Sequence, residues 1–351
     1  MRVGLTYDLK PEYLAMGFSE EEAAEFDSPE TIAAIEEVVV RRGHKPVRIG
    51  HAQALVARLA AGERWDLVFN IAEGLYGFGR EALVPALLEA YRIPYTFSDP
   101  LVLSLSLHKG MTKRVLRDLG VYTADFAVVE QEADVAAIQL PFPLFAKPVA
   151  EGTGKGISAA SKVHDRQELL QVCRLLLASH RQPVLVETYL PGRELTVGIL
   201  GTGARARAIG VLEVTLHRPA EAAGYSYLNK KLWEDRVSYA LVDDELAEEA
   251  RRLSLAAWRG LGCRDAGRID LRADAVGRLA VIELNPLAGI HPTISDLVIL
   301  AERAGMPYAE LISAILEEAL QRAAAAATAG PSPSPPLPSP SPPSLPAVVA
   351  Q

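Results

Sequence analysis

The chain has 351 residues, of which 49% are hydrophobic and 23% charged, and this composition is typical of a globular protein with two or three compact units. The net charge of -8 at pH 7 argues against nucleic acid or an acidic membrane surface as the main partner. Two widely spaced cysteines give no disulfide framework, and the sequence shows neither a signal-peptide pattern nor an apolar run near the roughly 20 residues that span a bilayer, so we expect a cytoplasmic protein.

Residues 1–100 are predicted to form an α/β domain with an open parallel sheet. Three short apolar segments are expected to be strands, at 2–7, 47–49 and 66–71. A helix is expected after Ser28 and Pro29, because serine is a common N-cap and proline is favoured at the first helical position. Ligands of such sheets bind at the loops that follow the strands, and a Gly-rich loop at 73–79 follows the third strand.

Residues 101–190 are predicted to form a small α+β lobe that binds phosphate. Its loop Glu151-Gly152-Thr153-Gly154-Lys155-Gly156 is rich in glycine, and glycines let backbone N–H groups approach phosphate oxygens. Lys109 and Lys147 stand before a helix and at the end of a strand, where each adds a positive charge. The loop is not a Walker A motif, because Lys155 is followed by glycine rather than serine or threonine. A flexible turn is the alternative reading.

Residues 191–322 are predicted to form a third unit around a hairpin. Its strands are 268–271 and 281–286, with a turn at 274–278. Alternation along the strands places the oxygen-bearing side chains on one face, namely Asp270, Glu283 and Asn285. Two carboxylates and an amide are hard ligands that suit Mg²⁺, and Arg268 adds a cation beside them. Two ordinary strands with polar residues facing water are the alternative.

Two polar segments lie outside these patterns. Residues 217–236 form a long loop that contains Lys230 and Lys231, and a loop of this length is usually a lid or disordered. Residues 323–351 pass from an alanine run into a Pro- and Ser-rich stretch, which predicts a disordered tail. A PxxP-type ligand for an unknown partner is the alternative for this tail.

The order of these features resembles the ATP-grasp superfamily and, within it, the D-alanine–D-alanine ligases. The resemblance covers most of residues 1–322. The matching segments are 93–96, 108–109, 146–148, 151–154, 186–187, 192–197, 267–270 and 283–286. It implies an N-terminal parallel-sheet domain followed by two lobes, 101–190 and 191–322, that enclose ATP.

The resemblance also implies site residues. ATP phosphates are expected at Lys109, Lys147, Glu151, Gly152, Thr153, Gly154 and Gly156. The adenine is expected at Glu187, Tyr189 and Leu190, and the ribose at Glu194. Two Mg²⁺ ions, or Mn²⁺ in their place, are expected at Asp270, Glu283 and Asn285. The catalytic residues are expected to be Arg268 and Gly289, which would stabilise the tetrahedral intermediate and the acyl phosphate, and Lys230 in a loop that covers the site.

The resemblance is weaker in the residues that would select amino acids. The family has a glutamate after the first strand that holds the ammonium of the first amino acid, and residues 8–27 show no clear equivalent. Glu73 stands where a histidine is usual, and Lys231 replaces a tyrosine. His291 lies in an altered segment and is a candidate substrate contact. Glu73 is a candidate ammonium partner, with a solvated loop acid as the alternative.

We therefore expect an ATP- and Mg²⁺-dependent ligase that joins a carboxylate to an amine through an acyl phosphate. Amino acids are the expected small-molecule substrates, and the resemblance implies a role in making a peptidoglycan precursor. A homodimer is compatible with these properties, and neither nucleic acid nor a membrane is an expected partner. The alternatives are a related ligase for other amino acids or small carboxylates, and a non-catalytic ATP-binding scaffold that recruits a partner through its tail.

Overall fold

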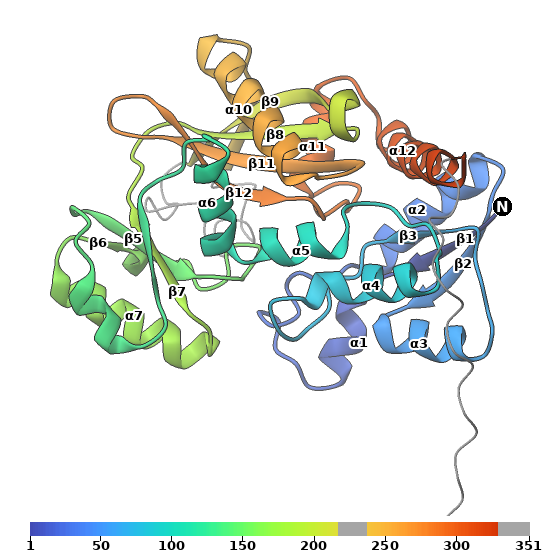
Figure 1. Ribbon diagram of the computed structural model, residues 1–351, viewed down its shortest axis with the longest axis horizontal. Helices are drawn as coiled ribbons and strands as arrows, with labels where there is room; N and C mark the ends of the chain where they lie inside the picture. Colours follow the sequence, from blue (N-terminus) through green and yellow to red (C-terminus); the bar gives the residue numbers. More distant parts are fainter. Residues whose placement is uncertain (217–236, 329–351) are drawn as a thin grey trace, which may run out of the picture.

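The computed structural model describes residues 1–216 and 237–328, which are organised by three separate sheets. Figure 1 shows the N-terminal sheet and the central sheet at opposite ends of the molecule, with the C-terminal sheet above and between them. One sheet is parallel and the other two are antiparallel. This arrangement confirms the expected combination of a parallel α/β unit with α+β lobes.

The N-terminal sheet is parallel, as the alternation of strands and helices predicts. Its strands are ordered β2-β1-β3, with β1 over Arg2–Thr6, β2 over Lys45–Gly50 and β3 over Leu67–Asn70. Its helices are α2 (Pro29–Arg41), α3 (Ala52–Ala60) and α4 (Leu83–Ala90). The hydroxyl of Ser28 accepts a hydrogen bond from the amide of Thr31, so it caps α2 as expected.

The segment between β1 and α2, residues 8–27, folds into a compact excursion from this unit. It contains α1 (Lys10–Ala15), and Leu9 pairs with Asp27 so that the two ends of the segment meet. Its apolar cluster consists of Tyr13, Ala23 and Phe26, with Leu14, Phe18 and Leu75 packed against them. Because Leu75 belongs to the loop after β3, the cluster holds the segment beside that loop.

The central sheet is antiparallel in the order β4-β7-β5-β6 and supports the Gly-rich loop 151–156, which follows β5. Its strands are β4 (Phe126–Val129), β5 (Leu144–Pro148), β6 (Lys162–Val163) and β7 (Val184–Thr188). Helix α7 (Arg166–His180) buries Leu169 and Cys173 against the apolar residues of these strands. Its N-cap is Asp165, whose carboxylate accepts from the first amides of the helix.

The C-terminal sheet is antiparallel in the order β10-β9-β8-β11-β12, and helices cover both of its faces. Its strands are β8 (Glu194–Leu200), β9 (Arg207–Leu216), β10 (Val237–Leu241), β11 (Ala266–Ala273) and β12 (Leu279–Asn285). Helix α10 (Glu245–Leu261) buries Trp258 on one face. Helix α11 (Asp296–Arg303) places Leu300 against the opposite face, where Gly198 leaves room for it.

The predicted hairpin at the edge of this sheet is present. The amide of Asp274 donates to the carbonyl of Arg278 over 2.9 Å, which closes the turn between β11 and β12. Helices α5 (Pro100–Leu107) and α6 (Lys109–Asp118) pack on the same sheet, since Val102 and Leu116 join the core beneath α10. The chain therefore enters the C-terminal core before it builds the central sheet.

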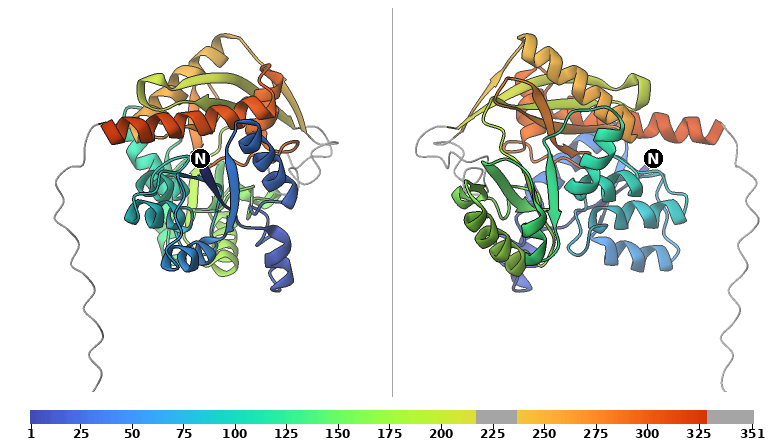
Figure 2. Two further views of the ribbon diagram at one scale, coloured as in Figure 1. Left: turned by 90° about the vertical axis from the view of Figure 1, so that its right-hand side faces the viewer. Right: turned by 60° about the vertical axis from the view of Figure 1, so that its left-hand side comes forward.

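The last helix, α12 (Tyr308–Thr328), joins the two ends of the chain. Leu311 and Ile315 pack in one core with Ile35 of α2 and Val3 of β1. Residues 323–328, which the sequence places in the tail, are the last turns of this helix, because alanine has the highest helix propensity. Figure 2 shows this end of α12 projecting past the rest of the ribbon. The predicted tail beyond residue 328 lies outside the described residues.

Within residues 1–216 and 237–328, no helix combines the length and the apolar character that a membrane span requires.

Candidate active site

A cleft of about 770 Å³ lies between the central sheet and the hairpin of β11 and β12. One wall comes from the central lobe and includes Phe145, Lys147, Thr153, Gly154, Glu187, Tyr189 and Leu190. The other wall comes from the C-terminal sheet and includes Glu194, Arg268, Asp270, Arg272, Glu283 and Asn285. The cleft therefore brings together residues that the sequence assigns separately to phosphate, adenine, ribose and metal.

A buried charge network forms the floor of this first cleft. Glu187 on β7 accepts from two lysines, with Lys147 Nζ 2.8 Å from Oε1 and Lys113 Nζ 2.8 Å from Oε2. Burial alone would raise the pKa of Glu187, but the two lysines outweigh it and lower the pKa to about 2. The carboxylate is thus ionised, and it holds Lys147 at the mouth of β5.

Lys113 was not among the residues that the sequence singled out. It lies one helical turn after Lys109 on α6, is almost completely buried, and donates to the hydroxyl of Thr123 over 2.6 Å. Burial lowers the pKa of Lys113, and Glu187 opposes that effect. The i, i+4 spacing of the two lysines on one helix face is the signal that could have indicated it.

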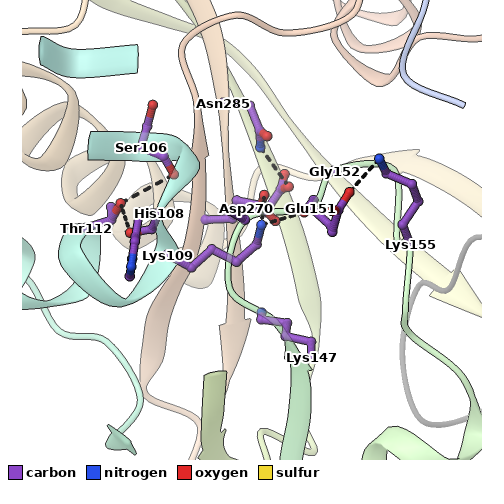
Figure 3. A network of polar contacts seen from close by, with 12 residues as sticks. Ser106, His108, Lys109, Thr112, Lys147, Glu151, Gly152, Lys155, Asp270 and Asn285 are labelled. Carbon is purple, nitrogen blue, oxygen red and sulfur yellow. Dashed lines mark hydrogen bonds and ion pairs between the residues drawn. The ribbon is translucent and has the colours of Figure 1, made fainter. Parts of the chain in front are cut away.

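Lys109 joins the central lobe to the metal-ligand candidates. Its Nζ donates to the backbone carbonyl of Glu151 over 2.6 Å and lies 3.0 Å from Oε1 of Glu283. Figure 3 shows Lys109 reaching from α6 toward the Gly-rich loop, with Lys147 entering from β5. Burial would raise the pKa of Glu283, but Lys109 and Lys147 hold it below its usual value. A single cation therefore contacts both walls of the cleft.

The three predicted metal ligands lie together on the hairpin. Asp270 stands directly opposite Glu283 in the strand register, and Asn285 Nδ2 donates to Asp270 Oδ2 over 3.2 Å. Arg268 Nη1 lies 2.6 Å from the same oxygen. Figure 3 shows Asp270 and Asn285 facing each other beside Lys109. Hard oxygen donors beside fixed cations fit Mg²⁺, which commonly takes one or two carboxylates and completes its shell with phosphate oxygens.

A metal site built from protein side chains alone is not indicated. Among the described residues, no three His, Cys, Asp or Glu side chains are close enough together to hold a metal ion. The donors would therefore have to include Asn285 and the oxygens of a bound ligand. This requirement agrees with the position of the hairpin in a cleft wide enough for a nucleotide.

The Gly-rich loop has the backbone geometry of an anion cradle. Thr153, Gly154 and Gly156 have φ angles of 49°, 74° and 72°. The amide of Gly152 donates to Glu25 over 2.5 Å, and the buried hydroxyl of Thr153 has no hydrogen-bond partner in the described part of the chain. A buried hydroxyl at the cleft wall is a donor that a phosphate oxygen would satisfy.

Tyr189 and Leu190, the predicted adenine contacts, both line the first cleft. Lys162 Nζ lies 4.1 Å from the centroid of the Tyr189 ring, and Leu190 is buried. Glu194 Oε2 lies 3.3 Å from a guanidinium nitrogen of Arg272. The apolar patch with one carboxylate at its rim suits a base and a ribose.

A second cleft, of about 630 Å³, adjoins the first and shares Thr153, Arg268, Glu283 and Asn285 with it. Its far wall comes from the N-terminal domain and from the loop after β12, and consists of Glu25, Glu73, Arg80, Glu81 and residues 286–289. Arg80 is buried, with Nη2 2.7 Å from Glu25 and Nη1 2.9 Å from the carbonyl of Ala150. Gly289 and Glu73 thus both line this second cleft.

Glu25 is a site residue that the sequence did not reveal. It comes from the segment 8–27, reaches Arg80, and lies 3.4 Å from Lys155. Burial would raise the pKa of Glu25, but Arg80 and Lys155 lower it to about 2. No local pattern points to it, because its partners stand more than fifty residues away along the chain.

Three of the candidates are not placed in the clefts. Gly156 is absent from the described residues that line either of them. His291 is absent from the described residues that line either cleft; its Nε2 lies 3.6 Å from Glu30 of α2 and its amide donates to Ser295. Lys230, and Lys231 beside it, fall within 217–236 and so lie outside the described residues.

Comparison with known proteins adds to this geometry. The family described as D-ala D-ala ligase C-terminus matches residues 115–317. The D-alanine–D-alanine ligase of Bordetella petrii is 37% identical over 270 residues, which cover 75% of this chain and 78% of that relative. The uncharacterized protein y4sG of Sinorhizobium fredii is 34% identical over 259 residues, covering 73% and 75%. A solved D-alanine–D-alanine ligase from Bacillus anthracis superposes with a TM-score of 0.71 at 21% identity, covering 93% of this chain and 99% of its own.

The three sheets around a cleft with a Gly-rich loop, buried lysines and a carboxylate hairpin, together with the family match and the ligase relatives, define an ATP-dependent ligase of the ATP-grasp class. Within that class the chain belongs to the D-alanine–D-alanine ligase family, since the family match spans more than half of the chain and the relatives share about a third of their residues with it.

Proposed function

We propose that this ligase joins the carboxylate of one amino acid to the amine of a second, with conversion of ATP to ADP and phosphate. The observation that carries the proposal is the pair of adjoining clefts, which share Arg268, Glu283 and Asn285. A carboxylate is a poor electrophile until it is phosphorylated, so a nucleotide and an amino acid must meet at one point. The shared residues mark that point.

ATP is assigned to the first cleft. Lys147, Thr153 and Gly154 line this cleft and would bind its phosphates. Lys109, with the start of the loop 151–156, lines the second cleft and would bind the phosphates where the two clefts adjoin. The unpartnered hydroxyl of Thr153 supports this placement. Residues 187–190 would hold the base, and Glu194 would accept from a ribose hydroxyl.

Mg²⁺ is assigned to Asp270, Glu283 and Asn285, with two ions as the family resemblance implies. When bound, these ions would neutralise charge on the transferred phosphoryl group. Lys109 and Arg268 hold the two carboxylates in place from opposite sides. The orientation of the donors therefore does not depend on the ions.

The amino acids are assigned to the second cleft. Glu25 is placed to orient the ammonium of the first substrate, and the Arg268 guanidinium to stabilise negative charge that develops on the attacked carbonyl, beside the backbone of Gly289. The related D-alanine–D-alanine ligases make D-alanine the first compound to test. Exclusion of water from the acyl phosphate by the loop of Lys230 stays a prediction.

Glu283→Gln tests the proposal. With ATP, Mg²⁺ and a panel of D- and L-amino acids, the wild-type protein should release phosphate and yield a dipeptide visible by mass spectrometry. The variant should lose at least about a hundredfold in kcat, because it removes a charged donor at the phosphoryl-transfer point. Glu132→Gln, at an exposed ion pair with Arg174, is the matched control.

Two results would contradict the ligase assignment. One is a folded wild-type protein that binds ATP but releases no phosphate with any amino acid, which would indicate a binding protein without turnover. The other is an undiminished rate in Glu283→Gln.

A further inference from the structure

The second cleft is lined by more carboxyl groups than cationic side chains. Five carboxylates line it, namely Glu25, Glu73, Glu81, Glu151 and Glu283, and three cations face them, namely Arg80, Lys109 and Arg268. With all of these groups ionised the lining has an excess of two negative charges. An α-amino acid with a neutral side chain is a zwitterion, so its entry leaves that excess unchanged.

The cations of the cleft are already paired. Arg80 binds Glu25, Lys109 binds Glu283, and Arg268 binds Asp270. Glu151 is paired with Lys155, which reaches it from within the same loop. The excess charge therefore rests on the remaining two carboxylates.

Glu73 and Glu81 are those two carboxylates. In the described part of the chain neither side chain has a hydrogen bond or an ion pair within 4.0 Å, and each is only partly accessible to solvent. Burial raises the pKa of both, and neighbouring acids, Glu25 among them, add to the effect. Acids held in this way have a strong preference for an incoming cation.

The second cleft also leads toward space for a long side chain. A third cavity, of about 1570 Å³, shares Arg80 and Glu151 with it. Its lining includes two further acids, Glu21 and Glu22, and two aromatic residues. The rings of Tyr76 and Phe78 are 75% and 42% exposed. Open aromatic rings favour an ammonium or guanidinium group. The three acids of this cavity, Glu21, Glu22 and Glu151, are matched by Arg80, Lys155 and Arg181, so its preference for a cation rests on the rings and on the adjoining Glu73 and Glu81.

Building on the proposed ligase function, we propose that one of the two substrates is an amino acid with a cationic side chain, and that Glu73 and Glu81 select it. Its α-ammonium and its side-chain cation together supply two positive charges against one carboxylate. The side-chain cation of such a substrate favours the ionised form of Glu73 and Glu81 and supplies the ion-pair partner that these acids lack, whereas D-alanine has no such cation. Glu73 and Glu81 act as specificity-determining residues.

Lysine and norleucine are the matched probes, because they share a straight side chain and differ in the terminal ammonium. In the phosphate-release assay, kcat/KM for lysine should exceed that for norleucine at least about tenfold in the better enantiomer, as a charge-assisted contact implies. Ornithine and arginine should resemble lysine. Equal or better use of norleucine or D-alanine would overturn the inference while leaving the ligase function intact.

Glu73→Gln and Glu81→Gln test the assigned residues. Each should lower the lysine-to-norleucine ratio of kcat/KM roughly tenfold, and Glu37→Gln, on the exposed side of α2, should preserve it. Circular dichroism checks that each variant folds. The lysine-to-norleucine ratio of kcat/KM in the wild-type protein tests the cationic selectivity without any variant. Unchanged ratios in both variants would remove Glu73 and Glu81 from the selection.

Calorimetry separates this inference from the ligase function. Lysine and norleucine are titrated into the full chain with a non-hydrolysable ATP analogue, so no turnover is needed. Tighter binding of lysine without any phosphate release would support the charged pocket and contradict the ligase function. Equal binding, or binding of norleucine alone, would overturn the cationic selectivity.

Discussion

Two carboxylates of one cleft respond to their surroundings in opposite directions. Glu25 contacts Arg80 and Lys155, so its pKa falls to about 2 in spite of burial. Glu81 lacks such a partner, and burial raises its pKa to about 7, with Arg80 opposing and Glu25 reinforcing that shift. The groups that act on Glu81 also include Lys109 and Glu283. Local charge pairing, and not burial alone, sets the protonation state of each acid.

Glu81→Gln should change the pH dependence of stability. Because the folded-state pKa is raised from 4.5 to about 7, the folded chain holds an extra proton in this window, and the free energy of unfolding falls as pH rises from about 4.5 to 7. Between pH 5 and pH 7.5 the free energy of unfolding should therefore fall by on the order of 2 kcal/mol more in the wild-type protein than in the variant. Urea unfolding at pH 5 and pH 7.5 measures it, with Glu37→Gln as control. A wild-type slope in the variant would contradict the assignment.

At the scale of single residues, the sequence predicts those site residues that belong to a local pattern or have their partners nearby along the chain. Asp270 and Glu283 follow from strand alternation and a short turn, and Lys147 from a strand end. Glu25 and Lys113 do not, because their partners are brought to them by packing of separate elements.

At the scale of the elements, the Gly-rich loop after β5 is closely constrained by its surroundings at Gly156. Gly156 has a φ of 72°, and a Cβ at this position would lie 2.5 Å from Pro148 and 2.8 Å from His180. Gly277, in the turn between β11 and β12, has a φ of 89° but no atom within 4 Å of such a Cβ. Gly156 therefore combines a strained backbone angle with crowding, whereas Gly277 has the strained backbone angle alone.

Gly156→Ala should raise the KM for ATP at least several-fold and destabilise the fold by about 2–4 kcal/mol, since left-handed strain and a clash act together. Gly277→Ala should cost about 1–2 kcal/mol and leave the KM for ATP unchanged, because only strain acts there. Thermal unfolding and ATP titration of the rate measure both effects. Equal KM values in the two variants would show that the loop geometry does not matter for nucleotide binding.

The elements also show what local pattern can and cannot predict. The hairpin and the helix after Ser28 follow from turn and cap residues. The excursion at 8–27 has no clear periodicity, and its small core forms only because Leu75 closes it from another loop. Residues 323–328 continue α12 because alanine propagates a helix that Tyr308 and the following apolar residues have already anchored.

At the scale of the whole molecule, Asp265 connects three units. This fully buried carboxylate accepts from the amide of Phe97 over 2.7 Å and from two nitrogens of Arg322 at 2.8 and 2.7 Å. Arg322 also donates to the carbonyl of Tyr95 over 2.9 Å. The N-terminal domain, the start of β11 and the end of α12 are thereby joined at one point.

Asp265→Ala should destabilise the protein by about 3–5 kcal/mol, because it leaves a partly buried arginine without its counter-charge. Glu317→Gln, at an exposed pair between α12 and Arg42, the residue that follows α2, should cost less than about 1 kcal/mol. Urea unfolding of both variants tests the contrast. A loss below 1 kcal/mol in Asp265→Ala would show that the junction is not a stabilising contact.

The three-sheet organisation is visible in the order of strands and helices, but the docking of the units is not. The apolar residues of α5 are spread around the helix, so periodicity does not show which sheet it covers, and the structure places Val102 beneath α10. The boundaries at 100, 190 and 322 remain predictions from sequence.

The shared core of β1 and α12 has a consequence for the newly made chain. Val3 and Leu5 leave the ribosome well before Leu311 and Ile315, which cover the same core. At about 5–20 residues per second, roughly 15–60 s of synthesis separate them. During that interval the core that β1 shares with α2 lacks the cover of α12, so a ribosome-associated chaperone would have to shield it, and chains that terminate before Leu311 would be substrates for proteolysis.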